Sequence, residues 1–208
     1  MIVAVLSATV LPGVARAEDA AVSAPVLVVL GDSLSAGYGI DVDLSWTALL
    51  QARLAEQGYE HRVVNASISG ETTEGGVTRI GDIVERLEPA VVVVELGGND
   101  GLRGFPPSTT RDNLNRIIET ARSAGASVAL LGIRIPPNYG PRYIKAFEGT
   151  FRDVATANDV PWIEFFMDGI ALDKELMQAD GIHPNAKAQP RLLDNAWPAI
   201  REALGPAD

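Results

Sequence analysis

The chain has 208 residues, of which 47% are hydrophobic and 21% charged, contains no cysteine and carries a formal net charge of -10. The lack of cysteine excludes disulfides, zinc–thiolate sites, iron–sulfur clusters and a thiol nucleophile. The acidic balance argues against a nucleic-acid binder, because such proteins need clustered lysine and arginine to contact phosphates.

The first residues have the pattern of an export signal. Residues 1–14 are apolar and uncharged, and the triplet Ala15-Arg16-Ala17 follows them. This pattern predicts a secretory signal peptide cleaved after Ala17, although no lysine or arginine precedes the apolar stretch as is usual. The stretch is shorter than the roughly 20 residues that span a bilayer. We therefore expect a single domain of residues 18–208, periplasmic or secreted, without an integral membrane segment.

Strand and helix patterns alternate along the rest of the chain. Five short apolar runs, several of them apolar over consecutive residues like strands buried on both faces, lie at 26–30, 62–65, 91–96, 127–132 and 162–166. Apolar residues recur with the helical period at 46–54, after the N-cap Ser45, and at 77–87, 114–121, 143–154 and 185–204. The alternation predicts a three-layer α/β/α fold, in which helices cover both faces of a parallel sheet.

Four polar or glycine-rich segments follow the predicted strands. They are residues 31–35, 65–70 and 97–100, and, after a short excursion behind the last strand, residues 180–184. The carboxyl ends of parallel strands lie along one edge of a sheet, where α/β proteins bind their ligands. We therefore expect the four segments to form one site.

These segments carry the residue types of a hydrolytic triad. A serine such as Ser33 is unreactive unless a base lies within hydrogen-bond reach and a further group orients that base. Of the two histidines, only His183 lies in one of the four segments, three residues after Asp180. The Asp180 carboxylate can accept the Nδ1 proton of His183 while Nε2 faces Ser33. With so few histidines, we expect no metal centre.

The same segments hold candidate donors for an oxyanion. Gly70 has no Cβ, so its N–H can approach a ligand closely, and Asn99 offers a side-chain NH₂ from a glycine-flanked turn. The N–H of Ser33 is a third candidate. Each segment alone is an ordinary turn or helix cap, and only their conjunction favours a catalytic site. His61 lies before the second strand, and we expect it to be a solvated surface residue.

The segments resemble the four sequence blocks of the SGNH, or GDSL, family of serine hydrolases. The matching residues are GDSL at 31–34, Gly70, GGND at 97–100 and DGIHP at 180–184. Longer stretches, at 65–72, 94–104, 133–143, 165–170 and 180–190, resemble the bacterial periplasmic thioesterases, lysophospholipases and arylesterases of that family. The resemblance extends over residues 26–204.

This resemblance implies a fold, a set of site residues and an activity. The fold is flavodoxin-like, with five parallel strands. Ser33 is the nucleophile, Asp180 and His183 are its partners, and Ser33, Gly70 and Asn99 are the oxyanion donors. The implied activity is hydrolysis of carboxylic esters and acyl thioesters through an acyl-serine intermediate, without a cofactor.

An apolar acyl-binding groove is the least defined part of the expected site. The candidate residues are Leu102, Phe105, Ile135, Pro136 and Tyr139. In the alternative reading, Ile135 and Tyr139 only complete the core. The glycines in residues 101–107 could hinge a small lid, whereas the prolines there could fix a static loop; we expect some mobility.

Other functions compete with serine hydrolysis. Residues 31–39 form a glycine-rich loop between a strand and a helix, as in nucleotide- or flavin-binding modules, but they lack G-x-G-x-x-G order and a P-loop lysine. A non-catalytic carbohydrate or lipid carrier is a further alternative. An α/β-hydrolase is disfavoured because no G-x-S-x-G elbow surrounds Ser33. We expect a monomer that acts on small acyl esters or thioesters.

Overall fold

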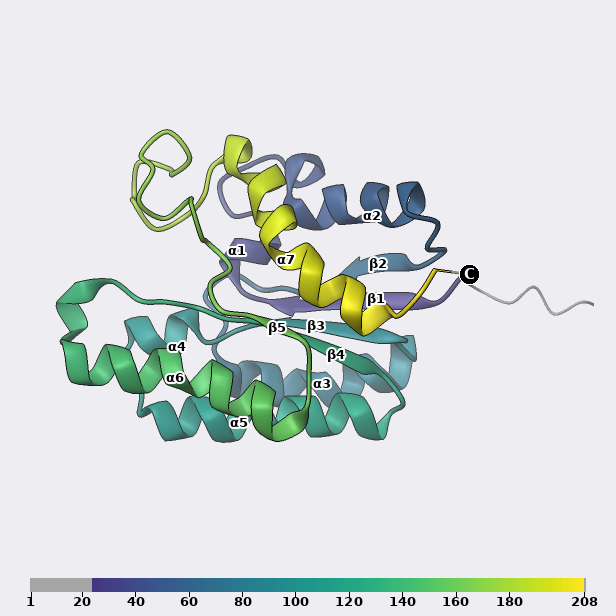
Figure 1. Cartoon of the computed structure of the whole chain (residues 1–208), viewed down its shortest axis with the longest axis horizontal. Helices are drawn as coiled ribbons and strands as arrows, with labels where there is room; N and C mark the ends of the chain where they lie inside the picture. The colour runs from purple at the N-terminus through teal and green to yellow at the C-terminus, as the bar shows by residue number, and fades with distance from the viewer. Residues whose placement is uncertain (1–23, 208) are drawn as a thin grey trace, which may run out of the picture.

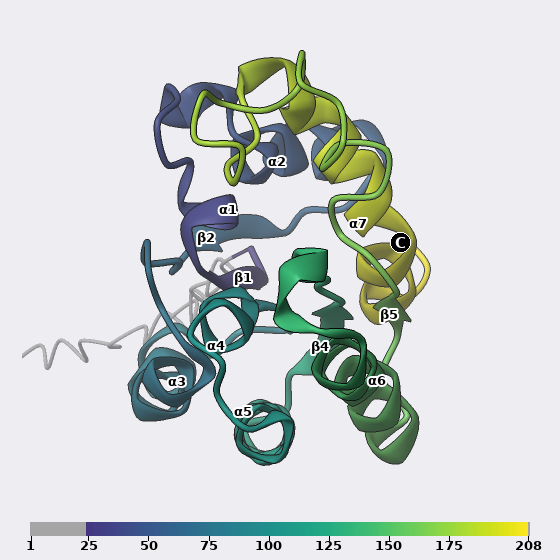
Figure 2. The ribbon, with the colours of Figure 1, turned by 90° about the vertical axis from the view of Figure 1, so that its left-hand side faces the viewer.

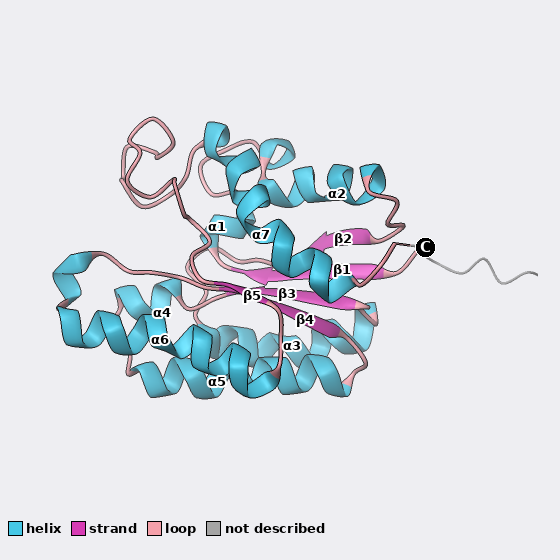
Figure 3. Cartoon of the chain, viewed as in Figure 1, coloured by secondary structure: helices cyan, strands magenta, loops and turns pink. Residues whose placement is uncertain are grey.

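The computed structural model describes residues 24–207. Within this range, five parallel strands form one sheet in the order β2-β1-β3-β4-β5 (Figures 1 and 3). The strands are β1 (Val26–Gly31), β2 (Arg62–Asn65), β3 (Val91–Glu95), β4 (Ser127–Leu131) and β5 (Trp162–Ile163). This is the flavodoxin-like strand order, with the switch in direction between β1 and β3. The predicted fold class is confirmed.

Helices cover both faces of the sheet (Figures 1 and 2). α2 (Trp46–Glu56) and α7 (Gln189–Leu204) pack on one face, and α3 (Thr73–Leu87), α5 (Pro107–Ser123) and α6 (Pro141–Asn158) pack on the other. Two short helices, α1 (Ser33–Ala36) and α4 (Gly98–Leu102), follow β1 and β3. Single 3-10 turns are η1 (Val42–Leu44), η2 (Pro137–Tyr139) and η3 (Ala186–Ala188).

The apolar strands supply two hydrophobic cores, one on each face. In β1, Val28 and Leu30 face the cluster under α3, α5 and α6, whereas Leu27 and Val29 face the cluster under α2 and α7. These four side chains have no exposed surface. Successive side chains of a strand point to opposite faces, so a strand covered on both sides must be apolar at every position.

Several elements differ in extent from the sequence prediction. β5 ends at Ile163 instead of residue 166, because its only neighbour, β4, already ends at Leu131. The one-turn helices α1 and α4 begin within the polar segments at 31–35 and 97–100 and extend beyond them. The last helix begins at Gln189 rather than at residue 185, after the 3-10 turn η3 that Asn185 caps.

The predicted signal peptide at residues 1–17 lies outside the described residues. Among residues 24–207, none of the helices is long and apolar enough to cross a bilayer.

Candidate active site

The turn between β1 and α1 places Ser33 at the carboxyl edge of the sheet, which faces the viewer in Figure 2. Asp32 caps α1, and its Oδ1 accepts the N–H of Leu34 at 3.0 Å. Gly31 has no room for a side chain, because a Cβ would lie 2.8 Å from Ser35 Oγ and 2.9 Å from Glu95 Oε2. The glycine and the aspartate together fix the backbone that presents Ser33.

Asp180, His183 and Ser33 form a continuous chain of hydrogen bonds. His183 Nε2 lies 3.0 Å from Ser33 Oγ, and His183 Nδ1 lies 2.7 Å from Asp180 Oδ2. Asp180 Oδ1 accepts the backbone N–H groups of Ile182 and His183 at 2.9 and 3.0 Å. The bond from the His183 side chain, and then these backbone bonds, lower the pKa of Asp180 to about 2. Asp180 is therefore ionised at neutral pH.

The loop that carries His183 is fixed by residues that the sequence analysis missed. The Gln178 backbone N–H donates to His183 O at 2.7 Å, and its side-chain Nε2 donates to Tyr38 O at 2.7 Å. Asn185 Nδ2 donates to Glu175 O at 2.8 Å. The rings of Tyr38 and His183 lie 4.4 Å apart, centroid to centroid. Amide side chains beside an Asp-x-x-His segment look like those of any polar turn, so nothing in the sequence distinguished them.

The three candidate oxyanion donors differ in what they already bind. In the described part of the chain, the backbone N–H groups of Ser33 and Gly70 donate to no other residue. Gly70 has a φ of +80°, a conformation that favours glycine. Asn99 Nδ2 instead donates to Asp32 Oδ2 at 3.1 Å and to Glu71 O at 2.9 Å. Both amide hydrogens of Asn99 therefore have acceptors.

A buried polar network joins the start of α3 to α4. Asp100 is fully buried, and its Oδ2 accepts the N–H of Thr73 at 2.9 Å while its Oδ1 accepts the Thr73 hydroxyl. Asn113 Nδ2 donates to the same hydroxyl at 3.1 Å. Gly70 lies three residues before the start of α3, and Asn99 lies on α4. The network therefore sets the spacing of the loop and the helix that carry these two candidate donors.

β3 ends in a carboxyl group buried beneath the serine turn. Glu95 has no exposed surface, and its Oε2 accepts the Ser35 hydroxyl at 2.7 Å and the N–H of Asp32 at 3.4 Å. Its Oε1 is buried and has no hydrogen-bond partner among the described residues. Burial, and then the nearby Asp32 charge, raises the pKa of Glu95 well above its usual range. Burial also raises the pKa of Asp32 to about 6.

Neither Glu95 nor Asp32 was predicted from the sequence to have a role in the site. A single acidic residue in the otherwise apolar run 91–96 was an available signal for Glu95. Such a residue is rarely buried without a partner or a function.

The predicted groove residues do not share one environment. Ile135 is only 7% exposed and belongs to the hydrophobic core, as in the alternative reading, and its contact with an acyl chain stays a prediction. The physical reason is its contact with α4 and α6, because a Cβ on Gly101 would meet both Ile135 and Phe147. Leu102, Phe105 and Tyr139 are half-buried, and Pro136 is exposed.

Hydrogen bonds tie the segment after α4 to its neighbours. The Tyr139 hydroxyl donates to Leu102 O at 2.8 Å, and the Tyr143 hydroxyl donates to Phe105 O at 2.7 Å. The Phe105 N–H donates to Asp100 O at 3.0 Å. These three bonds must break or move with the segment if residues 101–107 act as a lid, and that mobility stays a prediction.

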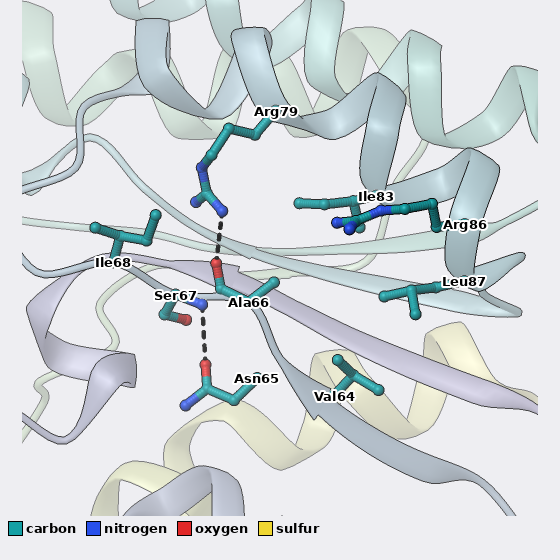
Figure 4. A pocket seen from close by; sticks show the side chains of 9 residues that line it. All are labelled: Val64, Asn65, Ala66, Ser67, Ile68, Arg79, Ile83, Arg86 and Leu87. Carbon is teal, nitrogen blue, oxygen red and sulfur yellow. Dashed lines mark hydrogen bonds between the residues drawn. The ribbon is translucent and has the colours of Figure 1, made fainter.

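Two cavities lie outside the triad. Figure 4 shows one of about 580 Å³ between β2 with its following loop and α3, lined by apolar Val64, Ile83 and Leu87 and by Arg79 and Arg86. Arg79 is held in place by its bond to Ala66 O at 2.9 Å and by its ion pair with Glu71. The other cavity, of about 510 Å³, lies in the loop of residues 171–181. No triad or predicted groove residue lines either cavity.

His61 is packed more closely than expected for a solvated surface residue. It is half-buried, its ring lies 6.2 Å from the Tyr59 ring, and its buried Nδ1 has no hydrogen-bond partner among the described residues. This burial lowers the pKa of His61. The expectation of a solvated residue is therefore wrong, although His61 lies before β2, at the edge of the sheet opposite to Ser33.

Comparison with known proteins identifies the family. The profile of the GDSL-like Lipase/Acylhydrolase family matches residues 29–190, which include Ser33, Asn99 and His183. The chain belongs to this family. As a GDSL, or SGNH, hydrolase it is an enzyme, and the predicted resemblance is confirmed.

Relatives in this family match along most of their length. Esterase TesA from Pseudomonas aeruginosa is 51% identical over 182 residues, which cover 88% of this chain and 90% of that protein. A protein from Escherichia coli K12 named thioesterase 1/protease 1/lysophospholipase L1 is 45% identical over 174 residues, covering 84% of this chain and 82% of that protein.

A solved structure of an esterase agrees with the fold. The psychrotrophic esterase EstA from Pseudoalteromonas sp., inhibited by monoethylphosphonate, matches with a TM-score of 0.81 at 42% identity, covering 86% of this chain and 98% of that one. This GDSL hydrolase is therefore an esterase-type enzyme, and the nucleotide-binding and carrier alternatives are set aside.

Proposed function

We propose that this GDSL hydrolase cleaves carboxylic esters and acyl thioesters through an acyl-serine intermediate on Ser33. The observation that carries the proposal is the unbroken chain from Asp180 through His183 to Ser33 Oγ, with bonds of 2.7 and 3.0 Å. A serine hydroxyl in this position has both a base and an orienter for that base.

The reaction follows from these positions. Ser33 Oγ attacks the acyl carbon and passes its proton to His183 Nε2, while Asp180 stabilises the imidazolium. The N–H groups of Ser33 and Gly70 donate to the oxyanion, and the NH₂ of Asn99 joins them when one of its hydrogens leaves Glu71 O. The alcohol or thiol leaves with the proton from His183. Water, with His183 as base, then attacks the acyl-serine and releases the acid and free Ser33.

The substrate class is supported by the names of the relatives, which include an esterase and a thioesterase 1/lysophospholipase L1. Leu102, Phe105, Pro136 and Tyr139 are the proposed surface for the acyl chain. If they form it, Phe105→Ala raises KM for long-chain p-nitrophenyl esters more than for the acetate. An equal change for every chain length would contradict this assignment.

Substitution of the triad tests the mechanism. Ser33→Ala and His183→Ala are each expected to lose ~10⁴-fold or more in turnover, because triad members act as a unit. The measurement uses p-nitrophenyl esters of increasing chain length, an acyl-CoA and a lysophospholipid. Near-parental turnover by Ser33→Ala would refute the mechanism.

Matched substitutions outside the site serve as controls. Ser123→Ala at the exposed end of α5 and His61→Ala beside Tyr59 replace the same residue types. Both are expected to keep parental turnover. If His61→Ala lost as much turnover as His183→Ala, His183 would not be the specific base.

We also propose that the mature enzyme is an exported monomer of residues 18–208. The apolar stretch before Ala17 supports export. Expression of the full chain in a bacterium, followed by N-terminal sequencing of the periplasmic fraction, is expected to give Glu18 first. Size-exclusion chromatography with light scattering checks the monomer. Retention of Met1 would contradict cleavage after Ala17, and the mass of a dimer would contradict the monomer.

A further inference from the structure

The orientation of the Asn99 side chain depends on the two acceptors that face it. Asp32 Oδ2 and Glu71 O each receive one amide hydrogen, at 3.1 and 2.9 Å. If the amide turned over, Asn99 Oδ1 would face two acceptors and make no hydrogen bond with either. Of these two acceptors, only Asp32 can change its character, since a carboxyl group that gains a proton becomes a donor.

We infer that Asp32 and Glu95 are positioning residues: ionised Asp32 holds the Asn99 amide with its NH₂ toward the oxyanion, and Glu95 holds Asp32 in place. This inference rests on the proposed function, in which Asn99 is an oxyanion donor. When Asp32 takes up a proton, its carboxyl O–H can donate to Asn99 Oδ1. The amide can then turn at the expense of its bond to Glu71 O, and the side-chain donor is lost from the site.

Glu95 contributes through the backbone of the serine turn. Its Oε2 accepts the N–H of Asp32 and the hydroxyl of Ser35, which fixes both ends of residues 32–35 against β3. Glu95 is fully buried, and two adjacent buried carboxyl groups do not both ionise readily. Glu95 therefore keeps the proton while Asp32 carries the charge.

Three titratable groups face Asp32 from the elements around it. Asp100 on α4 opposes its ionisation, and His183 in the loop of residues 180–184 favours it when protonated. Glu95 on β3 carries no charge while it keeps its proton. Asp180 has a pKa of about 2 and stays ionised throughout the range in which enzymes of this kind are assayed. Loss of activity as pH falls therefore involves two protonations, because the proposed mechanism needs both a neutral His183 and an ionised Asp32.

The pH dependence of kcat/KM tests this inference. Two required deprotonations give a limiting slope of two for the acid limb of log kcat/KM against pH, and one gives a slope of one. The parent is expected to show a slope of two. Asp32→Asn is expected to show a slope of one, and to lose about tenfold to hundredfold in kcat with little change in KM, because a single amide oxygen cannot serve both Leu34 N–H and Asn99.

Two outcomes would overturn the inference. One is a parent slope of one, and the other is an Asp32→Asn variant that keeps either the parental kcat or a slope of two. Failure of the proposed function would give a different result, because Ser33→Ala would retain turnover at every pH. As a control, enzyme is held at each acidic pH and then returned to pH 7.5. It must recover full activity, which shows that unfolding does not contribute to the slope of log kcat/KM against pH.

A second pair of variants keeps the inference testable if Asp32→Asn does not fold. Glu95→Gln preserves the shape and an oxygen acceptor for Ser35 and Asp32, whereas Glu95→Ala removes both bonds. The kcat of Glu95→Gln is expected to be at least tenfold higher than that of Glu95→Ala. Equal losses in the two would overturn the role of Glu95.

A structural control comes from α6. Thr150 is buried, and its hydroxyl bonds to Ala146 O at 3.1 Å. Thr150→Ala is expected to lower Tm but to leave kcat and the slope of two unchanged. If Thr150→Ala changed the slope as Asp32→Asn does, the slope would reflect stability, and the inference would be wrong.

Discussion

Asn99 supplies the one side-chain donor among the three proposed for the oxyanion, and the other two are backbone N–H groups. Replacing a side chain leaves the backbone N–H of that residue in place, so a backbone donor cannot be removed without altering the backbone. Asn99 is therefore the residue at which the contribution of the oxyanion site is measured most directly. Its position on α4 is set by the bonds of Asp100 to the start of α3.

Asn99→Ala is expected to lower kcat by ~10²–10³-fold with little change in KM, because a donor to the oxyanion acts mainly in the transition state. Steady-state kinetics with p-nitrophenyl butyrate provide the measurement. Asn115→Ala, on α5, removes an amide whose Oδ1 accepts a bond from Asn158 Nδ2, and it serves as the control. A loss below about threefold would mean that Asn99 is not an oxyanion donor.

Helix α3 shows how the packing of one element fixes part of the site, since it begins three residues after Gly70. Its inner face lies directly on the sheet. A Cβ on Gly76 would lie 2.5 Å from Leu96 Cδ1 and 3.0 Å from Ile117 Cδ1. Gly81, on the exposed side of the same helix, has nothing within 4 Å of such a Cβ.

These two glycines predict opposite effects of the same substitution. Gly76→Ala is expected to destabilise the protein by ~1–3 kcal/mol through overpacking. Gly81→Ala is expected to stabilise it by ~0.5–1 kcal/mol, because alanine loses less backbone entropy in a helix. Urea denaturation of both variants checks the prediction. Stabilisation by Gly76→Ala would show that α3 is not packed closely on the sheet.

At the scale of the whole molecule, the buried acids place function and stability in opposition. The interior holds Asp32 and Glu95 side by side in a chain whose net charge is already -10. An ionised Asp32 is what the proposed site needs, yet burying its charge disfavours the folded state. Residues that violate the rules of a stable core are commonly found at functional sites for this reason.

The stability of the protein should therefore depend on the Asp32 charge. A pKa raised from 3.8 to about 6 means that the folded state binds this proton more tightly than the unfolded state. The contribution of Asp32 to the free energy of unfolding is thus retained below about pH 4 and lost as pH rises through 6. The loss amounts to at most about 3 kcal/mol, at about 1.4 kcal/mol for each pKa unit.

Urea denaturation of the parent and Asp32→Asn at pH 4 and pH 7.5 measures this term. The free energy of unfolding of Asp32→Asn minus that of the parent is expected to be larger at pH 7.5 than at pH 4. Asp43→Asn, which removes an exposed acid at η1, is the control and should show no such change. If this difference in the free energy of unfolding were the same at both pH values, the raised pKa of Asp32 would be contradicted.

Local sequence patterns were sufficient to predict the elements and to propose the main site residues. Strands apolar at consecutive positions indicate a sheet covered on both faces, and the period of the helices marks the covering layers. Ser33, Asp180 and His183 could be proposed because each follows a strand in a short polar segment. Ile135 could not be assigned in this way, since a branched apolar residue fits a core and a groove equally well.

The sequence by itself determined the fold class, the strand boundaries to within a few residues, the family and the single imidazole available to activate Ser33. Only the tertiary structure decided that hydrogen bonds link Glu95, Asp32 and Asn99, that Ile135 is in the core, and that Gln178 holds the His183 loop. Periodicity and motifs are properties of neighbouring residues along the chain. Burial, pKa and the choice of hydrogen-bond partner depend on residues up to 150 positions apart, which only the folded chain brings together.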